Sequence, residues 1–383
     1  MGVPCSKRQS VHNLIVDIDK MTSPPWPPRP SYRCECHVSH NFFVRSVEMH
    51  FSYSGDDAQF LRSCQAALPE GGPTPEQVLA EVKEQREKRL KAPFEAEERA
   101  KIIAEKYIPK HRHIYTFNAE AMLCPSFLTL VTAFRQAGKK VTTGLLKELE
   151  GEGLLDKVRR GIWTFPVLKE SFCDQLEEEL SHFLASGLPH TAPNTMNRFG
   201  IIMAELGFGA LIQPLVRDYV DILATALLPN HTKGLDSYRA FTVLYDAEAE
   251  DGDKSLAMHY DNAEVTLNIN IGGAWQGGSV DFYGLATELD AGEQPVANVV
   301  LKRGHAVFHA GWELHQAQPV SSGRRHNLIL WCRSSGIRNF CCPMCSSAPR
   351  VLPTSALSDE GFTTPPCQRG AEVNGDDDDD LYS

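Results

Sequence analysis

Residues 265–271 alternate strictly between apolar and polar side chains, and this pattern constrains the fold more than any other feature of the chain. Valine, leucine and isoleucine occupy the odd positions, while threonine and asparagine occupy the even ones. Because side chains alternate between the two faces of a strand, the pattern predicts a strand with one apolar and one polar face. Other short strand-like segments lie at residues 238–245, 279–283, 298–302, 305–309 and 325–332.

A series of short strands separated by glycine turns favours an antiparallel jelly roll made of two sheets. The polar face of residues 265–271 would line its interior. Apolar residues recur at helical spacing over 172–184, and a second apolar segment covers 212–228. Both predict helices that pack on the outer face of a sheet, because the apolar side of the strands needs cover.

A histidine and an aspartate, His259 and Asp261, lie just before this strand. Two residues apart on an extended strand, they point to the same side. One imidazole and one carboxylate are two-thirds of the 2-His-1-carboxylate triad that holds non-haem Fe(II) and leaves coordination positions open. His315 is well placed as the third ligand. His305 and His309 are alternatives, which can also be read as hydrogen-bonded histidines near the mouth of the barrel.

Arg325 lies ten residues after His315, at the start of the apolar run 327–331. A guanidinium at this point can hold a carboxylate through two parallel hydrogen bonds. Neither His305 nor His309 has a basic residue at the same spacing. A metal triad together with a carboxylate clamp is what an oxygenase that consumes a 2-oxo acid requires.

At these residues the chain resembles the 2-oxoglutarate- and iron-dependent dioxygenases, and it is most similar to their prolyl- and lysyl-hydroxylase branch. The segments 163–167 and 241–245 share the resemblance, which covers roughly residues 160–335. The resemblance implies an α+β fold with a double-stranded β-helix (jelly-roll) catalytic domain and packing helices. It also implies Fe(2+), 2-oxoglutarate and O2 as cofactor and co-substrates, dependence on L-ascorbate, and hydroxylation of a protein side chain with release of succinate and CO2.

The resemblance further implies roles for individual residues. His259, Asp261 and His315 would bind iron, and Arg325 would bind 2-oxoglutarate. Arg324 competes with Arg325, but in related enzymes the clamp shares a strand face with residues two, four and six positions on, which favours Arg325. Related enzymes often place a tyrosine on the co-substrate carboxylate, a role that would fall to Tyr245. Alternatively, Tyr245 is a tyrosine of the core.

Two other functions fit parts of the pattern. A jelly roll that is catalytically silent would act as a binding or scaffold module through its N-terminal region, although such a module has no reason to keep both triad and clamp. A zinc hydrolase also uses histidine and aspartate ligands. Arg325 argues against this hydrolase, because zinc hydrolysis needs no clamp for a 2-oxo acid.

The chain divides into five parts. Residues 1–30 form a proline-rich leader expected to be disordered, 31–150 a mixed, mostly helical N-terminal region, and 160–335 the dioxygenase domain. A cysteine-rich segment, 336–350, and an acidic tail, 351–383, also expected to be disordered, complete the chain. Within the second part, Thr74 and Gln77 form a capping box that starts a helix. Pro93 is expected to end that helix.

Composition limits the class of protein. The net charge of −11 includes an acidic tail and no basic cluster, so nothing indicates nucleic-acid binding. No apolar stretch reaches the roughly 18 residues of a membrane helix. Eleven cysteines without a secretory signal indicate reduced thiols and an intracellular location, cytoplasmic or nuclear. Gly2 and Ser6 match an N-myristoylation pattern, although short motifs also match by chance.

The cysteine pairs leave a separate question open. Cys342-x-x-Cys345 has the spacing of half a zinc site, and the residues 34–40, with two cysteines and two histidines, could supply the other half. The alternative is a set of reduced structural thiols. The sequence favours the thiols, because nothing in it constrains the distance between the two halves.

Overall fold

Two antiparallel sheets form the centre of the computed structural model, which describes residues 31–138, 140–286 and 294–354. The larger sheet has the order β4–β5–β12–β8–β14–β6, with β9 paired to β14, and the smaller has the order β11–β10–β13–β7. Together they are a jelly roll, as predicted. The larger sheet contains β4 (Asp156–Arg159), β5 (Ile162–Pro166), β6 (Ser237–Asp246), β8 (Val265–Gly272), β9 (Trp275–Gly277), β12 (His305–Ala310) and β14 (Val320–Arg333). The smaller contains β7 (Leu256–His259), β10 (Val280–Leu285), β11 (Ala297–Val299) and β13 (Glu313–Ala317).

The alternation over residues 265–271 is realised in β8. Its apolar residues, among them Leu267 and Ile269, are fully buried in the main hydrophobic core. Thr266 and Asn268 point the other way and line the cavity between the sheets. The period-two pattern therefore separates a dry outer face from a polar interior, as expected for a strand covered on one side by helices.

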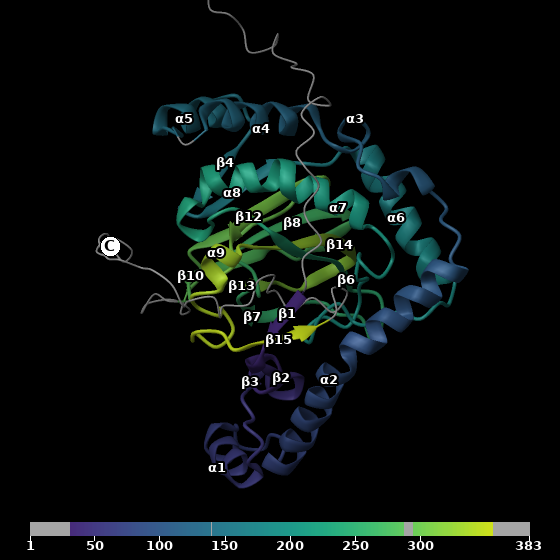
Figure 1. The fold of residues 1–383 in the computed structure, drawn as a ribbon, viewed down its shortest axis with the longest axis vertical. Coiled ribbons are helices and arrows are strands. Elements are labelled where there is room, and N and C mark those ends of the chain that lie inside the picture. The colour runs from purple at the N-terminus through teal and green to yellow at the C-terminus, as the bar shows by residue number, and fades with distance from the viewer. Residues whose placement is uncertain (1–30, 139, 287–293, 355–383) are drawn as a thin grey trace, which may run out of the picture.

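Helices cover the outer face of the larger sheet (Figure 1). Buried residues of α4 (Pro125–Ala137), α6 (Glu170–Ala185), α7 (Gly209–Leu215) and α8 (Asp221–Leu227) belong to one core with those of β8, β12 and β14. A π-helical turn, Val216–Val220, joins α7 to α8 where a single helix was expected. The described helices and strands thus form the predicted α+β arrangement.

A small second hydrophobic core lies at one end of the molecule, around the N-terminal half of a long helix. This helix, α2 (Pro75–Lys106), begins with the predicted capping box between Thr74 and Gln77. Its N-terminal half packs with α1 (Asp57–Ala67), β2 (Phe42–Val44) and β3 (Met49–Phe51) in a cluster separate from the main core. Figure 1 shows these elements at the far end of α2 from α6.

The expected end of this helix at Pro93 is wrong, because α2 continues through it for a total of 32 residues. Proline has no N–H to donate, so it leaves the carbonyl four residues earlier without its helical partner. That carbonyl belongs to Arg89, and it accepts a hydrogen bond of 3.2 Å from the guanidinium of Arg33. A side chain from a distant segment therefore replaces the missing hydrogen bond.

The packing differs from the expected division of the chain at two places. The main core includes buried residues from Ile103 to Leu155, so it extends across the boundary expected near residue 150. Residues 351–354, assigned to the acidic tail, form β15 (Val351–Thr354), which pairs with β1 (Ser31–Cys34). Figure 1 shows these two strands side by side. The remaining helices are α3 (Ala119–Met122), α5 (Thr143–Gly151) and α9 (Ser335–Arg338).

Some expectations cannot be compared with the structure. Those for residues 1–30, including the pattern at Gly2, and for residues 355–383 lie outside the described residues. Among the residues that are described, no helix combines the length and the hydropathy needed to cross a membrane.

Candidate active site

Strand pairing brings two of the predicted metal ligands together. β13 runs antiparallel to β7, and their register sets His315 directly opposite His259. The two imidazole rings have centroids 4.2 Å apart. Residues that lie directly opposite on paired strands have adjacent side chains on one face. The pairing of β13 with β7 therefore brings together two histidines that are far apart in the sequence.

Asp261 was expected on the same strand as His259, but β7 ends at His259, so the aspartate joins this pair from the irregular segment that follows. Its Oδ1 lies 3.6 Å from His259 Nε2 and 3.8 Å from His315 Nε2. Its backbone N–H donates to the carbonyl of Gly311 over 2.8 Å. A Cβ at position 311 would come within 1.9 Å of the Ala263 carbonyl oxygen, so only glycine permits this close approach. The glycine thus helps to hold the aspartate against the histidines.

In both histidines a hydrogen bond made by Nδ1 orients the ring so that Nε2 faces Asp261. His259 Nδ1 lies 2.8 Å from the carbonyl of Ala257, and His315 Nδ1 lies 2.8 Å from the carbonyl of Glu313. A carbonyl can only accept, so each Nδ1 carries the proton and donates. Each Nε2 is then left with its lone pair free for a metal, which is how metal-binding histidines are usually oriented.

The charge states of the group also suit a metal cation. Burial, followed by the neighbouring His315, lowers the pKa of His259 to about 3. Burial raises the pKa of Asp261, but the neighbouring His315, His259 and His309 and the hydrogen bond from Thr266 together lower it below its usual value. At neutral pH His259 is therefore uncharged and Asp261 is ionised, as metal ligands must be.

The three ligand atoms are close enough to share one ion. The ligand atoms of His259, Asp261 and His315 all lie within 4.8 Å of one another. Two atoms that are each about 2.1 Å from one metal ion lie no more than about 4.2 Å apart. The two measured separations from Asp261 satisfy this limit, and the residues therefore fit a metal ion held by two histidines and one carboxylate.

The alternative third ligands have other surroundings. His309 is buried, with its Nε2 4.0 Å from the second oxygen of Asp261, Oδ2, and its Nδ1 2.8 Å from the Ala310 carbonyl. Thr266 donates a hydrogen bond of 2.6 Å to the same Oδ2. His305 is only partly buried, at the start of β12. Thr266 therefore supports the aspartate through Oδ2, while Oδ1 faces His259 and His315, and the His309 ring lies beside that of His315 with centroids 4.9 Å apart.

Arg325 and Arg324 point in opposite directions from β14. Arg325 is 3% exposed, and its guanidinium lies 4.4 Å from the centre of the Tyr245 ring. Among the described residues, no carboxylate pairs with it and its Nε has no hydrogen-bond partner. Arg324 instead has a side chain that is 56% exposed and pairs with Asp246 over 3.2 Å. The predicted choice of Arg325 as the inward-facing residue agrees with this arrangement.

The three candidate metal ligands and Arg325 line one cavity between the two sheets. Its volume of about 40 Å3 is several times the roughly 10–15 Å3 that a single water needs. The residues of β14 expected to share a face with Arg325 line it as well, as do side chains from β6, β7, β8 and β13. These lining residues include Asn197, Tyr245, His259, Asp261, Thr266, Asn268, His315, Arg325, Asn327, Ile329 and Trp331.

The sequence placed Thr266 in the interior, on the polar face of residues 265–271, but it did not predict the hydrogen bond from Thr266 to Asp261. It gave no indication of Asn197. Asn197, whose amide donates to the Tyr245 hydroxyl over 3.3 Å, comes from an irregular segment before α7. No motif marks it, because its place depends on how that segment folds over the sheet.

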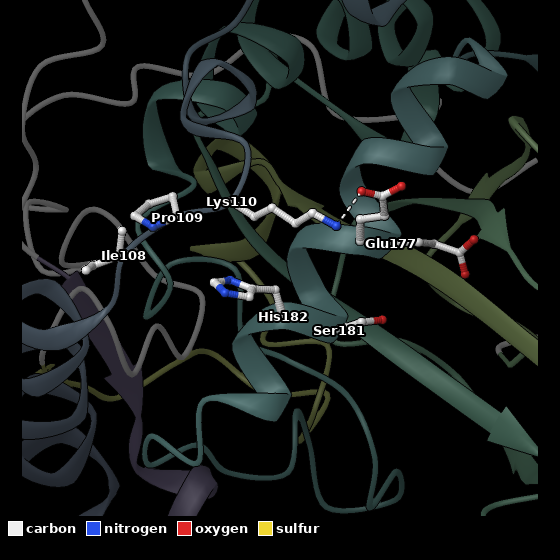
Figure 2. Close-up of a pocket in the computed structure, with 7 residues that line it drawn as sticks. Ile108, Pro109, Lys110, Glu177, Ser181 and His182 are labelled. Atoms are coloured by element: carbon white, nitrogen blue, oxygen red, sulfur yellow. Dashed lines mark ion pairs between the residues drawn. The ribbon is translucent and has the colours of Figure 1, made fainter.

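A second hollow lies on the outside of the molecule, where the segment after α2 faces α6. Figure 2 shows Lys110 reaching toward α6, where it pairs with Glu178 over 2.7 Å. The hollow is lined by Ile108, Pro109, Lys110, Glu177, Glu178, Ser181 and His182. It shares no residue with the metal-binding group. The chemistry that the sequence predicts therefore belongs to the interior cavity.

Fold and ligand set together define a class of protein. Two histidines and one carboxylate on a jelly roll, with open positions facing a cavity, are typical of the non-haem Fe(II) oxygenases. A model of the OGFOD2-like domain family matches residues 103–233. The 2-oxoglutarate and iron-dependent oxygenase domain-containing protein 2 of Xenopus tropicalis is 39% identical over 343 residues, which are 88% of this chain and 95% of that protein.

Two more distant proteins are also similar. The multifunctional procollagen lysine hydroxylase and glycosyltransferase LH3 of Rattus norvegicus is 26% identical over 195 residues, which are 48% of this chain and 25% of that protein. A Pseudomonas putida prolyl-4-hydroxylase structure matches 46% of this chain and 93% of that chain, at 18% identity and a TM-score of 0.34.

The chain belongs to the family of 2-oxoglutarate and iron-dependent oxygenase domain-containing protein 2. The identity and the coverage of both chains establish this membership. The predicted enzyme class, an oxygenase dependent on iron and 2-oxoglutarate, is thereby confirmed.

Proposed function

We propose that this protein hydroxylates a side chain of another protein. In this proposal His259, Asp261 and His315 hold Fe(II), and Arg325, stacked on Tyr245, binds the far carboxylate of 2-oxoglutarate. The observation that carries the proposal is the buried guanidinium, which lines the same cavity as the metal-binding group and has no carboxylate partner among the described residues. A buried charge without a partner is costly, so it is expected to meet an anionic ligand.

The reaction uses each part of the cavity. Fe(II) held by His259, Asp261 and His315 would supply open coordination positions for the co-substrate and O2, while the electrons that reduce O2 would come from 2-oxoglutarate and from the substrate C–H bond. Arg325 and Tyr245 would hold the far carboxylate of the co-substrate and so orient its 2-oxo acid end toward the metal-binding residues. One oxygen atom enters the new carboxylate of succinate as CO2 leaves, and the other enters a C–H bond of the substrate as a hydroxyl group. The apolar side chains of Ile329 and Trp331, which line the cavity, would limit the access of water to the reacting groups.

The substrate class rests on the more distant relative. The lysine hydroxylase from rat acts, by its name, on procollagen, and it is similar to about half of this chain. A side chain of a protein is therefore the substrate class that we propose.

Formation of succinate tests the oxygenase activity. The full-length protein, loaded with Fe(II), is incubated with 2-oxoglutarate, O2 and ascorbate, and succinate is measured by NMR. Asp261→Ala is the matched control, because it removes a metal ligand and leaves the sheet hydrogen bonds in place. We expect succinate from the wild type and none above background from the variant.

The substrate class needs a second measurement. Cells that carry either the wild type or Asp261→Ala are compared by mass spectrometry for peptides that gain one oxygen atom. Peptides hydroxylated only with the wild type, and hydroxylated by it again when purified, support the proposal. Equal succinate formation by both forms contradicts the metal site. A wild type that forms succinate while the two peptide sets remain identical contradicts the protein substrate alone.

A further inference from the structure

Four cysteines from opposite ends of the described chain meet at one point. Cys34 ends β1, and Cys36 lies in the 3-10 helix Glu35–Val38 that follows. Cys342 and Cys345 lie in the turn after α9. The pairing of β1 with β15, in which Cys34 faces Val351, brings these segments together. The two halves whose distance the sequence leaves unconstrained are thus adjacent.

The sulfur atoms have the spacing of ligands around one ion. All four lie within 4.8 Å of one another, and the Sγ atoms of Cys36 and Cys342 are 3.7 Å apart. Four sulfurs at about 2.3 Å from a tetrahedral zinc ion are about 3.8 Å apart. A disulfide would instead bring two sulfurs to about 2.05 Å. All four cysteines are free thiols.

The local backbone is shaped for this grouping. The N–H of Cys342 donates to the Ser347 carbonyl, and the N–H of Ser346 donates to the Cys342 carbonyl, each over 2.8 Å. These bonds close a tight turn around Cys342-x-x-Cys345, and Ser346 adopts a left-handed conformation with φ of 52°. Such a turn points both sulfurs of a C-x-x-C pair to one side, which is the spacing found in structural zinc sites.

Apolar packing at this point is too limited to explain the arrangement. Among the residues that the structure describes, three buried cysteines form the cluster, and four partly buried residues pack against it: Tyr32, Met344, Cys345 and Val351. A small cluster of this kind contributes little hydrophobic stabilisation, and small units of structure commonly rely on a metal instead. The sulfur atoms therefore account for the meeting of the two segments better than burial alone does.

We propose that Cys34, Cys36, Cys342 and Cys345 bind a structural Zn2+ ion. Four protein ligands complete a tetrahedral shell and leave no open position, so the ion has a structural and not a catalytic role. The site shares no residue with the group of His259, Asp261 and His315. It would tie residues 31–38 to residues 342–354.

The proposed ion also secures a segment that reaches the active site. Phe43, a few residues after Cys36, packs in the cluster that contains Tyr245 and Phe241. Arg45 donates to the carbonyl of Met196 over 2.7 Å, at the edge of the same region. Without zinc, the segment that carries Phe43 would be tied down less firmly at its N-terminal end.

Metal analysis of the full-length protein tests the site. We expect one zinc ion per chain by mass spectrometry of the metals, and loss of that ion in Cys342→Ser. Cys341→Ser is the matched control, because Cys341 is an exposed neighbour outside the group. Asp261→Ala is expected to keep its zinc while losing iron, which separates this test from that of the proposed function.

A spectroscopic experiment on the wild type covers the case in which Cys342→Ser does not fold. Co(II) exchanged into the zinc site should give the intense thiolate charge-transfer and tetrahedral ligand-field bands of four sulfur ligands. A thiol-modifying reagent should release the ion in step with four thiols. Wild-type protein from zinc-rich medium that lacks zinc and gives no such bands overturns the proposal. So does an iron–sulfur cluster, or a Cys36–Cys342 disulfide, found at these residues.

Discussion

Replacing Arg325 by methionine should abolish tight binding of 2-oxoglutarate without weakening the apo fold. The guanidinium is 3% exposed and has no carboxylate partner among the described residues. Burial lowers its pKa, and only Tyr245 acts in the opposite direction. Burying a charge without a partner costs free energy, so an apolar side chain of similar length should leave the apo protein as stable or more stable.

The size of the effect follows from the burial. Removing one partner of a buried charge pair costs about 3–5 kcal/mol. Each 1.4 kcal/mol is about a factor of ten in affinity, so the Kd for 2-oxoglutarate should rise by at least about a hundredfold. Arg325→Lys should recover only part of this loss, because an ammonium group cannot form two parallel hydrogen bonds with a carboxylate.

Thermal unfolding with and without co-substrate measures both parts of this prediction. With Mn(II) in place of iron, 2-oxoglutarate at a hundred times the wild-type Kd should stabilise the wild type by about 2.7 kcal/mol. Arg325→Met should lose nearly all of this stabilisation. Arg324→Ala is the control, since Arg324 is exposed and pairs with Asp246, and it should behave as wild type. The reasoning is refuted if Arg324→Ala loses the stabilisation and Arg325→Met retains it.

Three further predictions concern the metal ligands, their support and the sheet. Asp261→Ala and His259→Ala should lose iron but retain the wild-type circular dichroism spectrum; full iron occupancy in either would remove these residues from the site. Thr266→Val, which deletes the hydrogen bond to Asp261, should weaken iron binding by about 10–100-fold in a chelator competition. Burial lowers the pKa of His326 to about 4 in the folded protein. In the unfolded chain this histidine has its ordinary pKa of about 6.5, so the unfolded chain takes up the proton at higher pH, and the free energy of unfolding falls as the pH drops below about 6.5. Between pH 7 and pH 5 the free energy of unfolding, measured with urea, should fall by about 2 kcal/mol more in the wild type than in His326→Gln. Equal decreases in the two proteins would contradict this prediction.

Local periodicity was sufficient for several features of the site. The alternation over residues 265–271 predicted which side of β8 faces the helices and which faces the cavity. The same period of two distinguishes Arg325 from Arg324, because adjacent residues of a strand point to opposite faces. These features depend only on the geometry of an extended chain, and the sequence is enough to determine them.

The tertiary structure decided which distant residues meet. Three observations depend on strands or segments far apart in the chain: His315 opposite His259, Arg33 on the Arg89 carbonyl, and the four cysteines joined through β1 and β15. Pairing and register between such segments are set by the packing of the whole core, because each pairing must satisfy all the others at once. A local pattern predicts which face of a strand a side chain is on, but the residue that lies opposite it on the neighbouring strand is set only by the assembled sheets.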